Sequence, residues 1–89
     1  PAGVDAGAVR SYLAALPGVT RLHDLHIWPL STTDTALSCH LVMPGGHPGD
    51  GFLLDAANEL AHRFSIGHAT LQIEISEETA CRLAPDELV

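Results

Sequence analysis

Histidines and a carboxylate recur at positions that a small β-sheet could bring together. His23 and His26 lie in one apolar run, and His40 lies in the next. A third run begins at His68 and contains Glu74. Neutral imidazole is the commonest protein ligand for zinc and related ions, and carboxylates complete such sites. The residue types and their spacing therefore predict that the chain binds a divalent transition metal on a sheet.

Each of these histidines also has an ordinary structural alternative. His40 could form a hydrogen bond across the strands, and His23 could pair with Asp24 or with a backbone carbonyl. His26 could be a packing residue, since strict alternation of strand side chains puts it on the same face as Trp28. Asp24 could in turn be a direct metal ligand, a carboxylate that orients an imidazole, or a solvated charge.

Spacing limits how many of the candidates one ion can bind. His68 and Glu74 are predicted on one face of a strand, but the six residue-to-residue steps from one to the other span about 20 Å at roughly 3.3 Å per residue. One ion cannot contact both, so we expect two sites per chain or ligands shared with a second chain. Cys81 is a further candidate ligand, with a solvated tail residue as the alternative. Cys39 reads instead as a small buried residue between apolar neighbours.

Length and charge exclude several function classes. The chain has 89 residues, of which 46% are hydrophobic, enough for one small domain with a modest core. Its formal net charge is −7, with four arginines and no lysine, which argues against nucleic acid and anionic membrane surfaces as partners. No apolar run reaches the roughly 18–20 residues that cross a bilayer, so direct membrane insertion by this segment is not expected. Two cysteines do not make a disulfide framework and favour a reducing compartment.

The hydrophobic pattern predicts two helices and three strands in the order α-β-β-α-β. Asp5 is expected to cap the first helix and Pro17-Gly18 to end it. Asp50 is expected to cap the second helix, which should end at Ile66-Gly67. The predicted strands cover residues 19–30, 36–43 and 68–75. Two helices over one face of a three-stranded sheet make an α+β, two-layer sandwich of the ferredoxin-like or metallochaperone-like kind.

Alternation along the strands separates an apolar face from a polar one. In the second strand, His40 points to the face opposite to that of Leu41 and the other apolar residues. In the third strand, Glu74 likewise points to the face opposite to that of Ile73. In the first strand, strict alternation groups His23 with Leu25 and Ile27, and Asp24 with His26 and Trp28. This leaves open which of the two sets joins the polar face.

Several segments together resemble a known family. They are the Pro-Gly-Val run 17–19, the His-Asp-Leu-His-Ile-Trp run 23–28, the strand 36–42 and the run 66–74. In order and spacing they resemble the cytoplasmic C-terminal domain of cation diffusion facilitator transporters, from about Val4 to Glu74. The resemblance implies a domain over residues 1–75 that dimerises and binds zinc or a similar divalent ion. Residues 76–89 form an acidic tail, expected to be flexible.

The resemblance also implies roles for single residues. His23, His40, His68 and Glu74 match positions that are metal ligands in family members, the last two in animal members. Gln72 stands where some bacterial members have a ligating histidine, which argues against a two-metal cluster of the bacterial type. Animal members use a cysteine pair in the tail, of which this chain has only Cys81.

These observations predict a cytosolic, homodimeric, metal-sensing domain of a divalent-cation efflux transporter. The expected metal is zinc, with cadmium, cobalt, nickel and copper also compatible with histidine and carboxylate ligands. The expected partners are a second copy of the chain and the transmembrane domain of the same parent protein, which places the domain on the cytoplasmic side of a membrane. The alternative is a stand-alone small metal-binding module that acts through protein contacts. An enzyme is not expected, because no oxyanion loop or phosphate-binding loop with a basic anchor is present in the sequence.

Overall fold

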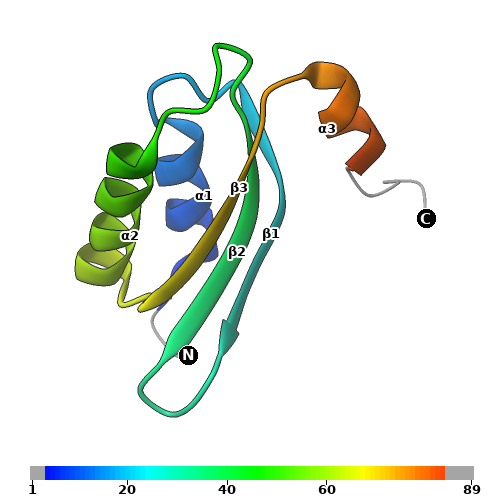
Figure 1. Cartoon of the computed structure of the whole chain (residues 1–89). Coiled ribbons are helices and arrows are strands. Elements are labelled where there is room, and N and C mark those ends of the chain that lie inside the picture. Colours follow the sequence, from blue (N-terminus) through cyan, green and yellow to red (C-terminus); the bar gives the residue numbers. More distant parts are fainter. Residues whose placement is uncertain (1–3, 84–89) are drawn as a thin grey trace.

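The computed structural model describes residues 4–83 and has two layers plus one additional helix. Its elements are α1 (Ala6–Ala14), β1 (Arg21–Pro29), β2 (Thr35–Val42), α2 (Asp50–Phe64), β3 (His68–Glu74) and α3 (Glu77–Leu83). The sheet order is β1-β2-β3, with β1 antiparallel and β3 parallel to β2. Helices α1 and α2 cover one face of the sheet (Figure 1), so the predicted α-β-β-α-β sandwich is confirmed. None of the helices within residues 4–83 is long and apolar enough to span a bilayer.

Local sequence explains where the two covering helices begin and end. The Asp5 carboxylate accepts a hydrogen bond from the Ala8 backbone N–H at 3.1 Å, which confirms the predicted cap of α1. For α2 the prediction was wrong by one residue: Gly49 occupies the cap position, and Asp50 is the first helical residue. Gly49 has φ 93, a conformation that glycine adopts without strain. The helix ends at Phe64, ahead of the predicted end, because Ser65 turns the chain in the left-handed conformation.

The core lies between the helices and the apolar face of the sheet. From the helices it includes Val9, Leu13 and Leu60, all fully buried. From β2 and the residue after it, the core receives the set that alternation predicted, namely Leu37, Cys39, Leu41 and Met43. Because β2 is the central strand and is covered on this face, its inward residues are the best shielded of the sheet.

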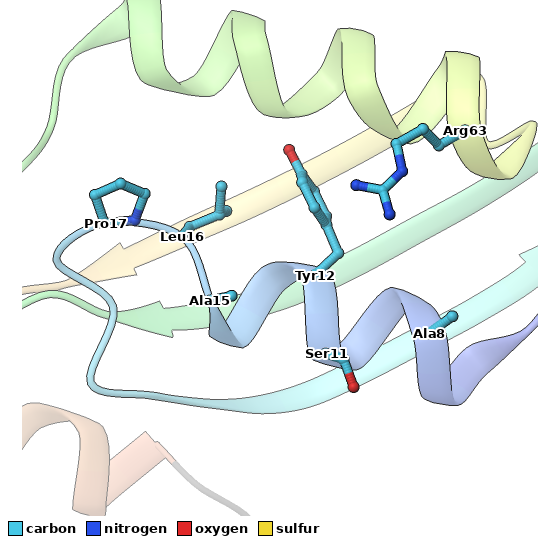
Figure 2. A pocket seen from close by; sticks show the side chains of 7 residues that line it. All are labelled: Ala8, Ser11, Tyr12, Ala15, Leu16, Pro17 and Arg63. Carbon is cyan, nitrogen blue, oxygen red and sulfur yellow. The ribbon is translucent and has the colours of Figure 1, made fainter.

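Aromatic rings and an arginine lie together where α1 and α2 meet. Figure 2 shows a groove between α1 and α2 with Tyr12 and Arg63 facing each other across it. The Arg63 guanidinium lies 5.3 Å from the Tyr12 ring centroid and 5.0 Å from that of Phe64, within the range of cation–π attraction. None of the residues that line this groove is a histidine, cysteine or carboxylate. Its contacts join the two helices and offer no set of metal ligands.

A third helix, which the sequence pattern did not predict, follows β3. Residues Glu77–Leu83 form α3, on the side of the sheet away from α1 and α2 (Figure 1). Ser76 caps it, because its hydroxyl accepts a hydrogen bond from the Thr79 backbone N–H at 3.0 Å. Ala80 is fully buried and Arg21 of β1 pairs with Glu77, so the helix packs on the domain. Sequence periodicity missed α3 because seven residues give too few turns to show a stripe. The rest of the predicted tail, residues 84–89, lies outside the described residues.

Candidate metal centre

A β-bulge in β1 decides which side chains reach the open face of the sheet. His23 pairs with His40 of β2, but His26 pairs with Ser38, so three steps along β1 match two steps along β2. Residues paired across a ladder point to the same face, so both histidines of β1 join His40 on the open face. Strict alternation, which put His23 and His26 on opposite faces, was therefore wrong. The extra residue lies in the Asp24-Leu25 step, where Asp24 has φ 53.

Three of the predicted ligands converge beside this bulge. His23, His40 and Glu74 each offer one ligand atom, and these atoms all lie within 4.8 Å of one another. The register explains the convergence: His40 is opposite His23 on one side, while Glu74 lies two residues farther along β3 than Gln72, the parallel partner of His40, and so on the same face. The two imidazole rings meet edge to face with centroids 4.6 Å apart. Three separate strands thus contribute one ligand candidate each.

The Glu74 carboxylate is the centre of this cluster. Only 3% of the residue is exposed, and its Oε1 lies 2.6 Å from His23 Nε2. Its Oε2 accepts a hydrogen bond from Gln72 Nε2 at 2.9 Å. Burial raises the pKa of Glu74, but the hydrogen bonds from His23 and Gln72 and the nearby imidazoles outweigh it, so the net pKa lies below its ordinary value. Glu74 is therefore an ionised, acceptor-only group at neutral pH.

The nitrogen atoms of the cluster are not fully satisfied by the protein. His40 Nδ1 lies 2.7 Å from Glu74 Oε2 but lacks hydrogen-bond geometry, and it is buried without a hydrogen-bond partner among the described residues. His23 Nδ1 is also buried without one. Buried polar atoms normally have partners, and leaving one without costs about 1–3 kcal/mol. Converging imidazole nitrogens and an ionised carboxylate are a donor set that zinc accepts. The residues present therefore fit a divalent transition metal.

Two more of the predicted residues border the cluster. Asp24 Oδ2 lies 3.5 Å from His23 Nδ1 and 3.9 Å from His40 Nδ1, and Asp24 Oδ1 lies 3.8 Å from His26 Nε2. The His26 side chain is 66% exposed, against 8% for His23. Asp24 thus contacts the far side of the buried histidine, and His26 stands at the solvent edge of the site.

The remaining two candidates lie away from the cluster. His68 is exposed at the opposite end of β3, where it pairs with Ala36, so the predicted separation from Glu74 along the strand is present. Cys81 is exposed on α3, where its sulfur lies 3.9 Å from the Arg21 guanidinium. Ligand roles for these two residues stay predictions, and within one chain neither joins the group of His23, His40 and Glu74.

One contributor was recognised only as a departure from a family pattern. Gln72 supplies the side-chain amide that holds the Glu74 carboxylate in place. Its position two residues before Glu74 on the same strand face was a usable signal, because side chains two apart on a strand are neighbours. The sequence contains no comparable signal for the bulge, because an aspartate within a strand pattern does not by itself predict a left-handed backbone conformation.

Comparison with known proteins identifies the family of the chain. A family model described as "Cation efflux protein, cytoplasmic domain" matches residues 1–76. The chain belongs to this family. It is 36% identical over 78 residues to the vacuolar zinc transporter of Toxoplasma gondii, covering 88% of the chain and 9% of that protein. It is 38% identical over 74 residues to a human proton-coupled zinc antiporter, covering 83% of the chain and 20% of that protein.

A solved structure is similar as well. It is the metal-bound C-terminal domain of the CzcD transporter of Cupriavidus metallidurans, with a TM-score of 0.69 and 36% sequence identity, covering 80% of this chain and 99% of that one. The full transporter is longer, and this chain spans 24% of it. The predicted family and fold class are confirmed, and the family is one of transporter domains. The chain corresponds to the cytoplasmic part of such proteins and to a minor share of their length.

Proposed function

We propose that this domain binds one zinc-type divalent cation per chain through His23, His40 and Glu74, and that the bound ion regulates an efflux transporter. The observation that carries the proposal is the convergence of two imidazoles and one ionised carboxylate, with ligand atoms within 4.8 Å of one another. The Glu74 carboxylate is ionised and mostly buried, and its ion-pair contacts within residues 4–83 are all with histidines. A divalent cation at this point supplies the missing positive charge and a partner for the unsatisfied nitrogens.

The relatives support the transport context. They are described as a zinc transporter, a zinc antiporter and a metal cation efflux protein, and the similar solved domain is described as metal-bound. This favours a domain of a membrane transporter over a stand-alone metal-binding module. The transmembrane part of the same parent protein is then the partner that responds to binding. Transport depends on that part, and no catalytic role is assigned to this domain.

A second copy of the chain is the other partner. The matching family model is named for dimerisation, and on the open sheet face Trp28, the partner of Ala36, is exposed. His68 and Cys81, which are exposed and apart from the cluster, are available to ions shared between two chains. With a formal charge of −7 on each chain, two copies repel one another, and bound cations reduce that repulsion.

Calorimetric titration of the domain with zinc, in parallel for the parent and His40→Ala, tests the proposal. We expect His40→Ala to weaken binding by more than about 100-fold, since even residues that only orient metal ligands cost 10–100-fold. His62→Ala is the matched control, because His62 is an exposed histidine of α2 and α2 lies on the other face of the sheet. Its zinc affinity should equal that of the parent. Equal curves for the parent and His40→Ala would overturn the assignment of the site.

A further inference from the structure

The two ring nitrogens of His23 face two different carboxylates. Nε2 lies 2.6 Å from Glu74 Oε1, inside the candidate site, and Nδ1 lies 3.5 Å from Asp24 Oδ2, on its outer side. His23 is 8% exposed, so neither nitrogen can rely on bulk water. The proton of a neutral imidazole occupies one nitrogen at a time. Which carboxylate accepts it therefore depends on what occupies the other nitrogen.

In the metal-free domain the inner nitrogen of His23, Nε2, carries a proton. An ionised Glu74 only accepts hydrogen bonds, so His23 Nε2 has to donate at the 2.6 Å contact. In the neutral ring Nδ1 then carries a lone pair and faces the Asp24 carboxylate, whose oxygen also has only lone pairs. Among the described residues this Nδ1 is buried without a hydrogen-bond partner. The contact with Asp24 is unfavourable in this tautomer.

The preference reverses when His23 uses Nε2 as a metal ligand. The nitrogen then gives its lone pair to the ion, and the ring proton has to be on Nδ1, exchanged through solvent. Asp24 Oδ2 becomes the acceptor that the buried Nδ1–H requires. Metal-bound histidines almost always donate their other ring N–H to a carboxylate, a carbonyl or water, which fixes the ring and raises its basicity.

The backbone supports the same reading. Asp24 lies in the β1 bulge and has φ 53, a left-handed conformation that costs a non-glycine residue about 1–3 kcal/mol. Without the bulge the side chain would point to the opposite face from His23. The Asp24 side chain remains 26% exposed, and its ion-pair contacts within residues 4–83 are all with imidazoles. Within the described part of the chain, no ion pair with an arginine accounts for the placement of Asp24.

We infer that Asp24 is a positioning residue for the metal site: it is the acceptor for His23 Nδ1–H and so selects the tautomer whose Nε2 is free to bind zinc. The inference rests on the proposed function. It assigns to the bulge the task of bringing a carboxylate to the outer side of a buried metal ligand. Asp24 then acts through His23 and does not itself contact the ion.

Two substitutions that tolerate a left-handed residue test this role without disturbing the bulge. Asn and Gly both adopt positive φ readily. Asp24→Asn keeps an acceptor oxygen but loses the charge, whereas Asp24→Gly loses the acceptor as well. We expect zinc affinity to fall by about 10-fold in Asp24→Asn and by up to about 100-fold in Asp24→Gly. Asp34→Asn, the same charge change at an exposed turn position, should stay within about twofold of the parent.

Nitrogen chemical shifts of the His23 ring separate positioning from general electrostatics. In the zinc-saturated parent we expect the proton on Nδ1, and in saturated Asp24→Gly we expect exchange between tautomers or a change of ligating nitrogen. The inference is overturned if Asp24→Gly binds zinc as the parent does and keeps the same tautomer. If the parent itself does not bind, or His40→Ala binds equally well, the proposed function fails, so the two failures are distinguishable.

Discussion

The two faces of β2 carry neighbouring residues with opposite physical requirements. On the helix-covered face Leu41 is fully buried, with only apolar packing around it. On the open face the adjacent His40 side chain is 24% exposed and lies against two carboxylates. The first face contributes stability through burial. The second contains unsatisfied nitrogens and close charges, which cost stability in the absence of an ion. The residues of β2 that stabilise the fold and the residue proposed to bind metal therefore lie on opposite faces of the same strand.

The largest expected change in stability comes from removing a buried side chain on the helix-covered face of β2. Leu41→Ala should lower the free energy of unfolding by about 2–5 kcal/mol, because it removes a buried side chain and leaves a cavity. Denaturant unfolding of the metal-free domain measures this. Leu54→Ala is the control, since Leu54 is 62% exposed and should change stability by under about 0.5 kcal/mol. Similar losses for both substitutions would show that the covered face does not dominate stability.

Cysteine reactivity tests whether the helix-covered face is shielded from solvent. Burial raises the pKa of Cys39 to about 11, so at pH 8 it has roughly 100-fold less thiolate than a thiol of pKa about 9. Cys81 is exposed. Alkylation of the folded domain, followed by mass spectrometry, should therefore modify Cys81 first and Cys39 at least about 100-fold more slowly. Both should react at similar rates in denaturant. Equal rates in the folded state would contradict the burial of Cys39.

Acid stability probes the open face. The pKa of Glu74 is lower in the folded domain than in the unfolded chain, so its contribution to stability is complete above pH about 4.5 and is lost as the pH falls through the folded value. We expect the unfolding free energy of the metal-free parent to decrease in this range. Glu74→Gln should flatten that part of the profile and should also weaken zinc binding. An unchanged slope in Glu74→Gln would place the acid-sensitive group elsewhere.

The smallest expected change is in the spacing of two subunits. Light scattering should give a dimer without metal, and zinc should draw the subunits closer by offsetting their charge. We expect a partial shift, because moving an equilibrium from 1:99 to 99:1 takes about 5.5 kcal/mol. A spin label on the exposed Cys81, together with small-angle scattering of unlabelled protein, measures the distance with and without zinc. His40→Ala should show no change, and an unchanged parent would exclude sensing by closure.

The sequence by itself determined the two-layer fold and most of the ligand types. Apolar periodicity placed both covering helices, and alternation in β2 correctly separated Leu41 from His40. These features follow from local geometry, since helix and strand periods fix which side chains share a face. The caps at Asp5 and the breaker Pro17-Gly18 are likewise short-range signals.

Only the tertiary structure decided which candidates meet. The pairing of His23 with His40 depends on the register between β1 and β2, and the parallel register of β3 brings Glu74 to them while leaving His68 far away. The bulge at Asp24 turned His23 and His26 to the same face, against simple alternation. Register and bulges are set by contacts between strands distant in sequence, and a one-residue slip reverses every side chain. For that reason the histidines named from the sequence could be grouped into a candidate site only once the pairing of the strands was known.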